Sequence, residues 1–511
     1  MKRVDPAENR AASVRATLSG CRAGRVTAMF QPTFDSLREF SAPDWFRDAK
    51  FGIWSHWGPQ SVPMFGDWYA RNMYIEGTRQ YEYHVRHYGH PSRFGYKDIC
   101  QLWKAENFDP EALMDRYVKA GARYFVAQAS HHDHFFNYNS AVNRMNSVNV
   151  GPHKDILAMW KAAADRRGLP FGVTEHLAAS FSWWRVNKGC DKHGPYAGVP
   201  YDGNDPAWRD FYFDNYEHGT DNPQTARPWY TSNPAFKAYW LKAVTEMIDT
   251  FTPDFLYSDG ALPFGPHWQG DQNPGIREED YFEGLTAVAH LYNRSIEKWG
   301  SNHAVYLQKD RRQEIHSVGV LDIEKSQLPG IQERPWHTDT CIGNWFYDVQ
   351  NPYKQPDQII EMLVDIISKN GCMLLNILQK PDGSIDDDAV YILDELAKWF
   401  SVCSEAVYGT RPWRVFGEGD TFVKIEGFRE DKTAWLPGDF RFVQKDKAVY
   451  AFMMGIKPGQ TAVLRSFAEQ PVHSVRLLGA GELPFRQEFG ILAVPLPEKL
   501  PTAYTNVLRI E

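Results

Sequence analysis

Residues 251–260 read Phe-Thr-Pro-Asp-Phe-Leu-Tyr-Ser-Asp-Gly. A proline starts the run, aliphatic and aromatic residues fill its middle, and the carboxylate of Asp259 stands at its far end. This pattern is typical of a buried parallel strand that delivers one charged group to the top of a barrel. A buried charge costs free energy unless pairing or chemistry offsets that cost. Asp259 is therefore either the cap of a following helix or a residue with a chemical role.

Segments of the same design recur along the chain and alternate with amphipathic helical patterns. The strand candidates are residues 50–56, 122–130, 170–176, 254–259, 304–309 and 372–377. The clearest helical patterns are residues 110–119, 234–250 and 357–370. Repeated strand–helix units favour an α/β fold with a (β/α)8 barrel, and an open doubly wound sheet is the alternative. No Gly-x-Gly-x-x-Gly follows a first strand, which argues against a dinucleotide-binding fold.

The pattern changes after Trp413, where short β-like runs are separated by Gly, Pro and charged turns. These runs are residues 421–426, 448–453, 460–465, 474–478 and 491–494. Such spacing is typical of a β-sandwich. We therefore expect three parts: an N-terminal arm over residues 1–38, a catalytic barrel over 39–411, and a C-terminal β-sandwich over 412–511.

Composition narrows the possible partners. The chain has 511 residues, a net charge of −8 and no prominent basic run, which argues against nucleic acid. Its 18 Trp, 25 Tyr and 31 Phe favour a carbohydrate site, because aromatic faces stack on sugars. Six cysteines without Cys-x-x-Cys spacing indicate neither a disulfide framework nor a structural zinc site.

The sequence shows neither a membrane-spanning run nor a recognisable signal peptide. No apolar run reaches the length needed to span a membrane, so we expect no membrane partner. The first residues lack the apolar core of a signal peptide. The location stays open: secreted or periplasmic if a signal peptide has been removed, and cytoplasmic otherwise. The sequence gives no indication of oligomeric state.

Four of the strand candidates end in polar side chains. Besides Asp259, these are His56, the run His131-His132-Asp133-His134, and Glu175-His176. Barrel enzymes build their sites at such ends, although a lone histidine there is often a core residue. Imidazoles bind sugar hydroxyls, and Trp57 or Trp68 could stack on the ring. In an extended chain His132 and His134 would share one side, but no further metal ligand has matching spacing, so we expect no metal.

Four longer sequence motifs point to one particular protein family. Residues 45–58 read Trp-Phe-Arg-Asp-Ala-Lys-Phe-Gly-Ile-Trp-Ser-His-Trp-Gly and precede Ser-Val-Pro at 61–63. The others are Ala-Gly-Ala-Arg-Tyr leading to His-His-Asp at 120–133, Pro-Trp-His-Thr-Asp-Thr-Cys-Ile-Gly-Asn-Trp-Phe-Tyr at 335–347, and Lys-Asn-Gly-Cys-Met-Leu-Leu-Asn running to Pro-Asp-Gly at 369–383. Together they resemble glycoside hydrolase family 29, the retaining α-L-fucosidases.

The resemblance implies an exo-acting hydrolase that releases terminal α-L-fucose from an oligosaccharide or glycoconjugate without a cofactor. It makes Asp259 the nucleophile. The sugar-binding positions that it implies are His56, Asp67, Trp68, His131, His132 and His176. Three positions depart from the family pattern: Asp67 stands where many members carry Glu, His134 where Gly is usual, and Glu175 or His176 where Tyr is common. These departures leave an exo-α-L-galactosidase as an alternative.

The general acid/base is less clearly marked. Its candidates are Glu314, Asp322, Glu324 and Glu333. Glu324 best matches the region where the family places this residue, although it could instead pair with Lys325 or Arg334 on the surface. Arg311 is the candidate for orienting the nucleophile and balancing its charge. Two other classes stay open: a catalytically silent carbohydrate-binding homologue, and a metal-dependent hydrolase built on His131–His134.

Overall fold

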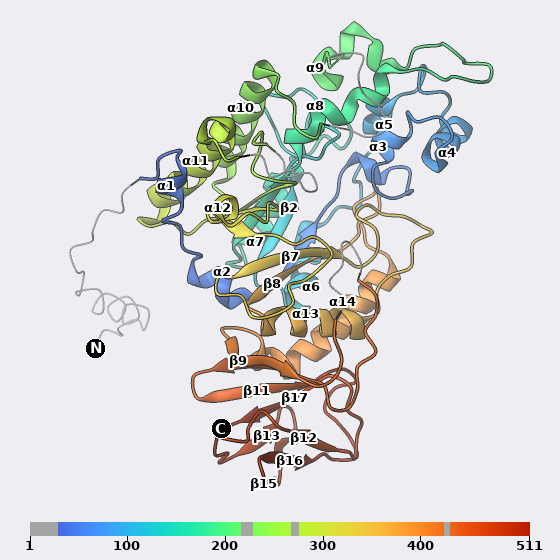
Figure 1. Cartoon of the computed structure of the whole chain (residues 1–511). Helices are drawn as coiled ribbons and strands as arrows, with labels where there is room; N and C mark the ends of the chain where they lie inside the picture. Colours follow the sequence, from blue (N-terminus) through green and yellow to red (C-terminus); the bar gives the residue numbers. More distant parts are fainter. Residues whose placement is uncertain (1–28, 216–227, 267–274, 424–429) are drawn as a thin grey trace, which may run out of the picture.

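The protein forms a parallel barrel followed by antiparallel β-structure, as seen in a computed structural model that describes residues 29–215, 228–266, 275–423 and 430–511 (Figure 1). Eight parallel strands make one sheet in the order β6-β5-β4-β3-β2-β1-β8-β7. Their bounds are β1 Phe51–Ser55, β2 Phe125–Gln128, β3 Phe171–Glu175, β4 Phe255–Ser258, β5 Val305–Gln308, β6 Val320–Leu321, β7 Trp336–Cys341 and β8 Gly371–Asn376. The expected α/β barrel is confirmed.

The barrel has a seam between β6 and β7, the two ends of the sheet. Backbone contacts cross it in the described chain at two places. Asp322 forms a bridge with His337, in which the Ile323 amide donates to the His337 carbonyl at 2.9 Å, and the Lys325 amide donates to the Asp339 carbonyl at 2.9 Å. These contacts place residue 324 in the barrel wall even though β6 itself is two residues long.

Helices cover the outer face of the sheet (Figure 1). The long ones are α6 Pro110–Lys119, α7 Ile156–Asp165, α10 Pro234–Phe251, α11 Phe282–Trp299, α13 Pro356–Ser368 and α14 Asp387–Cys403. The shorter ones are α1 Phe34–Leu37, α2 Asp44–Ala49, α3 Tyr69–Asn72, α4 Arg79–His87, α5 Tyr96–Leu102, α8 Ser180–Trp183, α9 Arg209–Tyr212 and α12 Gln313–His316. Within the described residues, each helix is too short or too polar to span a membrane.

Helix α10 shows how the sequence sets such an element. The Asn233 side chain accepts hydrogen bonds from the backbone amides of Ala235 and Phe236, which otherwise lack partners in the first turn. Pro234 occupies the first position, where its missing N–H and fixed φ suit a helix start. Trp240 and Val244 lie on the buried stripe that packs against the barrel.

The described part of the N-terminal arm packs on the barrel. The Phe30 backbone amide donates to Asn293 Oδ1 of α11 at 2.7 Å, and the Phe34 amide donates to Glu278 Oε2 at 2.8 Å. Phe34 also packs edge-on against Tyr281, with ring centroids 5.4 Å apart. Residues 1–28 of the expected arm lie outside the described residues.

Two antiparallel sheets follow the barrel. Six strands pair in the order β14-β13-β17-β11-β10-β9 and three in the order β12-β16-β15. Their bounds are β9 Arg411–Glu418, β10 Phe440–Lys445, β11 Ala448–Met453, β12 Thr461–Leu464, β13 Val475–Leu477, β14 Gly481–Glu482, β15 Arg486–Glu488, β16 Ile491–Pro495 and β17 Asn506–Ile510. The expected run at 421–426 is not a strand in its described part, residues 421–423, and 424–429 lie outside the described residues.

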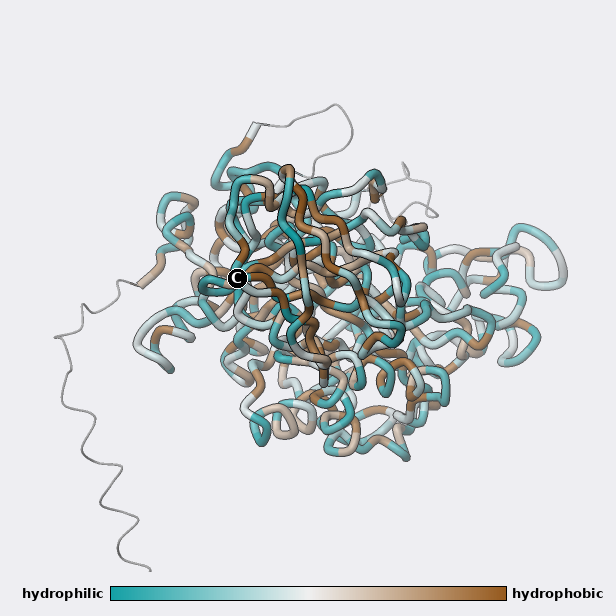
Figure 2. Tube along the Cα trace, turned by 90° about the horizontal axis from the view of Figure 1, so that it is seen from below, coloured by the Kyte–Doolittle hydropathy of each residue, from teal (hydrophilic) through white to brown (hydrophobic). Residues whose placement is uncertain are grey.

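The two sheets share one apolar core, which confirms the sandwich. Phe442 and Ala451 of the larger sheet contribute to it together with Leu464 and Leu492 of the smaller one. Seen from below, hydrophobic segments run through the middle of the molecule while hydrophilic ones occupy many peripheral loops (Figure 2).

A buried ion cluster ties the barrel to the larger sheet. Asp365 of α13 accepts from Lys369 Nζ at 2.6 Å and from Arg441 Nε of β10 at 2.5 Å. Helix α13 also packs on β9 and β10. The C-terminal structure is therefore attached beneath the sheet, away from the ends that carry Asp259 and Glu324.

Candidate active site

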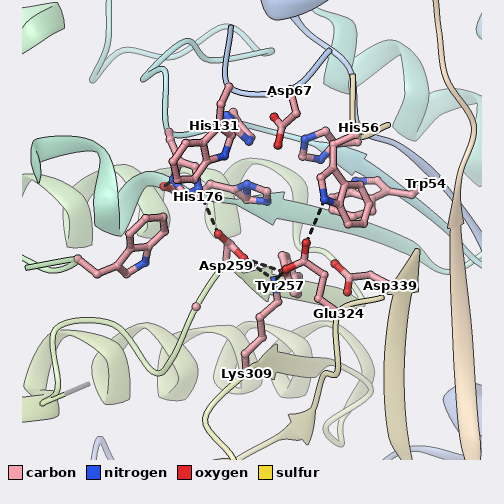
Figure 3. A pocket seen from close by; sticks show the side chains of 15 residues that line it. Trp54, His56, Asp67, His131, His176, Tyr257, Asp259, Lys309, Glu324 and Asp339 are labelled. Carbon is pink, nitrogen blue, oxygen red and sulfur yellow. Dashed lines mark hydrogen bonds and ion pairs between the residues drawn. The ribbon is translucent and has the colours of Figure 1, made fainter. Parts of the chain in front are cut away.

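A pocket of about 320 Å³ opens at the carboxyl ends of the barrel strands (Figure 3). Parallel strands of a barrel direct the residues that follow them towards one common face, so side chains from distant segments meet here. The lining residues are Trp54, His56, Asp67, Trp68, His131, His132, His176, Trp229, Tyr257, Asp259, Gly260, Lys309, Glu324, Asp339 and Trp345.

Asp259 directly follows β4 and is held by hydrogen bonds on both carboxylate oxygens. Its Oδ1 accepts from Lys309 Nζ at 2.7 Å and from the Tyr257 hydroxyl at 3.0 Å, while Oδ2 lies 3.1 Å from His132 Nε2. Burial alone would raise the pKa of Asp259, but the Lys309 ammonium and the His132 hydrogen bond hold that pKa well below its usual range. Asp259 is therefore an ionised, fixed carboxylate.

The glycine after Asp259 makes this presentation possible. Gly260 has a φ of 96°, a conformation that residues with a Cβ rarely adopt. A Cβ at this position would lie 2.6 Å from the Tyr230 hydroxyl oxygen. The chain can turn sharply away after Asp259 and leave the carboxylate at the pocket floor.

A single ammonium joins Asp259 to a second carboxylate. Lys309, which directly follows β5, contacts Glu324 Oε2 as well as Asp259 Oδ1. Glu324 Oε1 accepts from the indole N–H of Trp345 at 3.0 Å. In Figure 3, Asp259 and Glu324 lie next to each other with the Lys309 side chain reaching both. The side chains of Asp259, Glu324 and Lys309 are 17%, 18% and 19% exposed, so all three reach the pocket while most of their surface is covered.

The partners of His132 define its protonation. Nδ1 lies 2.7 Å from the His176 carbonyl oxygen and Nε2 lies 3.1 Å from Asp259 Oδ2. Both partners are acceptors, so both ring nitrogens must carry hydrogen. His132 is thus an imidazolium and a second positive charge beside Asp259.

Three other imidazoles face the pocket in the neutral form. Burial lowers the pKa of His56 to about 3 and holds the pKa values of His131 and His176 well below their usual range. His131 Nδ1 lies 2.8 Å from Gln60 Nε2, an amide donor, so the proton of the neutral ring is on Nε2. Both ring nitrogens of His56 and of His176 are buried without a hydrogen-bond partner in the described protein. Such groups suit a ligand rich in hydroxyls, because unpaired buried polar atoms are costly.

Two acidic side chains lining the pocket favour the neutral state. Burial raises the pKa of Asp67 to about 7. Burial, followed by repulsion from Asp322, raises the pKa of Asp339 well above its usual value. Behind the lining, Asp322 Oδ1 lies 2.6 Å from His337 Nδ1, and burial raises the pKa of Asp322 to about 7. Among these pocket acids, the carboxylate held ionised by its neighbours is therefore Asp259.

Three of the histidines lie close enough together to be considered as metal ligands. One possible donor atom from each of His131, His132 and His176 lies within 4.8 Å of the others. A metal ligand must offer an unprotonated nitrogen, yet both nitrogens of His132 donate and the free nitrogen of His131 carries the proton. Two of the three histidines therefore present hydrogens where a metal ion would need lone pairs, and this trio does not fit a metal ion.

Comparison with known proteins agrees with this geometry. Residues 18–405 match the family model described as Alpha-L-fucosidase. The chain belongs to the α-L-fucosidase family. It is 26% identical over 497 residues to the tissue alpha-L-fucosidase of Rattus norvegicus, covering 93% of this chain and 90% of the relative. The human tissue enzyme is 25% identical over 492 residues, with 93% and 89% coverage.

Solved structures of the family have the same fold. The Thermotoga maritima alpha-fucosidase in complex with fucose superimposes with a TM-score of 0.71 at 25% identity. That match covers 94% of this chain and all (100%) of the other. The family expected from the four sequence motifs is therefore confirmed.

Most of the residues expected at a fucosidase site lie in the pocket. The structure brings together His56, Asp67, Trp68, His131, His132, His176, Asp259 and Glu324. Trp68 has a left-handed backbone with φ 57°, and its ring is stacked with Trp229 at a centroid distance of 6.2 Å. Together these two indoles form an aromatic wall next to the histidines.

Arg311 does not line the pocket, so it does not take the expected place beside Asp259. Its side chain is exposed, and Lys309 contacts Asp259 instead. The chain turns at Asp310, whose amide donates to Gln308 Oε1 at 2.5 Å and whose Oδ1 accepts from the Arg312 amide at 2.9 Å. This turn breaks the strand alternation that would have kept residues 309 and 311 on one face.

The other acid/base candidates lie elsewhere. Glu314 on α12 and Glu333 are exposed and do not line the pocket, and Asp322 is buried behind it against His337. The alternative that Glu324 forms an ion pair on the surface is also wrong. Its carboxylate faces the pocket and pairs with Lys309 rather than with Lys325 or Arg334.

Several residues near the motifs have structural contacts instead. His134 Nδ1 faces the Phe211 carbonyl at 2.9 Å and Nε2 faces the Tyr239 hydroxyl at 2.5 Å, so His134 and His132 do not share one site. Glu175 Oε2 accepts from the Leu177 amide at 2.8 Å. Trp57 packs edge-on against Trp103 in the core at 4.8 Å.

Sequence reasoning missed several lining residues. Lys309 ends a strand candidate and could have been found by the same strand-end rule that selected Asp259. Trp345 and Asp339 lie within the quoted motif at 335–347, which gave no hint of their direction. Trp229 comes from a long connection between β3 and α10, where no periodic pattern signals a site.

Proposed function

We propose that this protein is an exo-acting, retaining α-L-fucosidase in which Asp259 is the nucleophile and Glu324 is the general acid/base. The supporting observation is that both carboxylates contact the same Lys309 ammonium. Two hydrogen-bond lengths of ~3 Å place the contacting oxygens no more than about 6 Å apart. Retaining glycosidases use carboxyl groups about 5–5.5 Å apart, whereas inverting enzymes need about 6.5–9.5 Å.

In the first half-reaction, Asp259 attacks the anomeric carbon of the terminal sugar. The glycosidic C–O bond breaks, and its electron pair goes to the leaving oxygen, which takes the proton of Glu324. The product is a glycosyl ester on Asp259 and a carboxylate on Glu324. The Tyr257, Lys309 and His132 contacts suit Asp259 to this role, because they fix its direction and keep it ionised.

In the second half-reaction, Glu324 takes a proton from water while the water oxygen attacks the same carbon. The ester bond breaks, and its electron pair returns to the Asp259 carboxylate. Two displacements at one carbon retain the α configuration. The Trp345 indole, which donates to Glu324, orients this carboxyl group in both steps.

The histidines account for recognition of one terminal sugar. His56, His131 and His176 offer neutral ring nitrogens to ring hydroxyls, and Trp68 and Trp229 offer aromatic faces. A pocket of about 320 Å³ accommodates one monosaccharide unit rather than a long chain. A Thermotoga maritima relative at 25% identity has been solved with a mechanism-based inhibitor, which agrees with a covalent intermediate in the family.

An α-L-galactoside is the second candidate substrate, since L-galactose is L-fucose with a hydroxyl at C6. The observation that favours it is the buried Nδ1 and Nε2 of His176, which lack partners, together with Trp54 Nε1. An added hydroxyl could pair with one of them. A site built around that hydrogen bond would reject fucose strongly, because its polar atoms would stay unpaired.

The test is hydrolysis of aryl α-L-fucoside and aryl α-L-galactoside under identical conditions, with the first-formed anomer followed by NMR. We expect α-L-fucose as the first product and a higher kcat/KM for the fucoside. A tenfold preference for the galactoside, ~1.4 kcal/mol in transition-state binding, would reverse the choice of sugar. An initial β anomer would contradict retention, and no turnover of either glycoside would indicate a silent binding homologue.

A further inference from the structure

We propose that Lys309 is the shared counter-ion of the two catalytic carboxylates, and that it allows their negative charge to move from Asp259 to Glu324 and back in each turnover. The proposal rests on the function proposed above. Lys309 acts through the two carboxylates, so it is a positioning residue. Nothing in its sequence context marks it for this role beyond its place at the end of a strand.

The geometry is that of a bridge. Lys309 Nζ lies 2.7 Å from Asp259 Oδ1 and also contacts Glu324 Oε2. The two acids come from different strands, β4 and the segment after β6, and β5 lies between these strands in the sheet. Residue 309 at the end of β5 is therefore placed by topology midway between the two carboxylates.

The charges in the two half-reactions explain why one bridging cation suffices. Before attack, Asp259 is a carboxylate and Glu324 carries a proton. After attack, Asp259 is a neutral ester and Glu324 is a carboxylate. Each state has one negative charge next to the same ammonium, so the reaction moves charge between two partners that Lys309 already contacts. A cation on Asp259 alone would oppose formation of the ester, since it would lose its partner.

The other ionisable groups around Lys309 do not replace it. Burial raises the pKa of Asp339 well above its usual value and that of Asp322 to about 7, so both favour the neutral form more than an ordinary carboxyl group does. Burial alone would lower the pKa of Lys309, but Asp259 and Glu324 outweigh it and raise that pKa well above its usual value. The groups facing Lys309 are Asp259 and Tyr257 from β4, Asp322 and Glu324 after β6, Asp339 of β7, and His56 and His176 across the pocket.

His132 carries the other positive charge at the site, but it serves one acid. Its Nε2 contacts Asp259 Oδ2, on the opposite carboxylate oxygen from Lys309, and its Nδ1 is occupied by a carbonyl. Among the described residues lining the pocket, Lys309 is the cation in contact with both carboxylates. This difference separates the two cations experimentally.

The test is the pH dependence of kcat/KM, which reports ionisations of the free enzyme. An ammonium favours the ionised form of both acids. Its removal in Lys309→Met should therefore move the acid limb, set by Asp259, and the alkaline limb, set by Glu324, to higher pH by about 1–3 units each. Lys309→Arg keeps the charge and should keep both limbs near their wild-type positions. A residue with a merely structural role would lower the rate without moving both limbs in one direction.

Controls separate this proposal from the one it rests on. Arg311→Met removes a nearby cation that lies outside the pocket and should leave the profile unchanged. A mechanism-based 2-fluoroglycosyl fluoride should label Asp259 in wild type and in Lys309→Arg; a label on another residue overturns the assigned catalytic residues themselves. If Asp259 is labelled and both limbs stay fixed in Lys309→Met, only the counter-ion role is wrong. Lys309→Gln serves as the neutral variant if Lys309→Met does not fold, and it must give the same upward shift of both limbs.

Discussion

His132 Nε2 lies 3.1 Å from Asp259 Oδ2, and His132 Nδ1 lies 2.7 Å from the carbonyl of His176, the next histidine along the pocket wall. The backbone of one sugar-binding candidate thus fixes the ring of another, which in turn holds the proposed nucleophile. Both contacts need a donor, so both ring nitrogens of His132 carry hydrogen beside the Asp259 carboxylate.

His132→Gln should lower kcat/KM by about 10–150-fold, the scale of one hydrogen bond to a charged group at ~1.5–3 kcal/mol. Asp259 would lose a cation, so the acid limb of the pH profile should move up. Glu324 has no contact with His132, so the alkaline limb should stay in place. Steady-state kinetics from pH 4 to 9 would check this, and a shift of both limbs would contradict the separate roles of the two cations.

Asp259→Gly should lower turnover by about 10⁴-fold or more, as expected when a nucleophile is removed from a coupled site. The fold should persist, because Gly260 and not Asp259 carries the unusual backbone conformation. Azide should restore turnover of an activated aryl α-L-fucoside and give the inverted β-azide, since it attacks from the vacated face. NMR identifies the azide product, and circular dichroism checks the fold. A folded Asp259→Gly variant that hydrolyses the substrate at the wild-type rate without azide would contradict the assignment of Asp259 as the nucleophile.

Glu324→Gln should lower kcat/KM about 10²–10⁴-fold for substrates with poor leaving groups. Activated aryl leaving groups need no proton, so their kcat/KM should change far less. Azide should raise kcat and give the α-azide, because it attacks the intermediate from the face that water uses. Glu333→Gln, an exposed acid outside the pocket, is the matched control and should behave like wild type.

Asp322 links folding stability to pH. Burial raises its pKa from 3.8 to about 7, so the folded protein keeps a proton that the unfolded chain releases between these values. Stability from this group is therefore full below about pH 4 and declines until about pH 7, by ~4 kcal/mol at ~1.4 kcal/mol per pKa unit. Asp322→Asn removes the titration and should flatten this decline in urea unfolding at pH 5 and pH 8. Glu314→Gln, on the surface, should leave the slope unchanged, and an equally steep decline in Asp322→Asn would show that other groups cause it.

Apolar strand-like runs between turns or helical patterns predicted six of the eight barrel strands. The two that were missed fail this rule for physical reasons. Strand β6 is two residues long. Strand β7 reads Trp-His-Thr-Asp-Thr-Cys, and its four polar side chains, at residues 337–340, are buried. Buried polar strands satisfy their side chains through partners that are distant in sequence, and no local pattern records those partners.

The sequence predicted pocket residues correctly where strand alternation sets the direction of the side chain. It predicted them wrongly where a turn comes between the strand and the residue. His176 continues β3 and faces the pocket while Glu175 faces the wall, as alternation requires. Arg311 and His134 follow tight turns: Asp310 redirects the first, and His134 itself has a φ of 61°. Side-chain direction after such turns depends on hydrogen bonds that a linear pattern does not contain.

The seam between β6 and β7 gives the two proposed catalytic carboxylates different local stabilities. Asp259 follows β4, which is paired on both sides, whereas Glu324 depends on the few backbone contacts made by Ile323 and Lys325. Segments with fewer cross-links open more often without global unfolding. We expect the amides of Ile323 and Lys325 to exchange with deuterium faster than those of β4. On heating, we expect Glu324 to lose its position while Asp259 is still in place. Early inactivation should therefore spare substrates whose leaving groups need no proton.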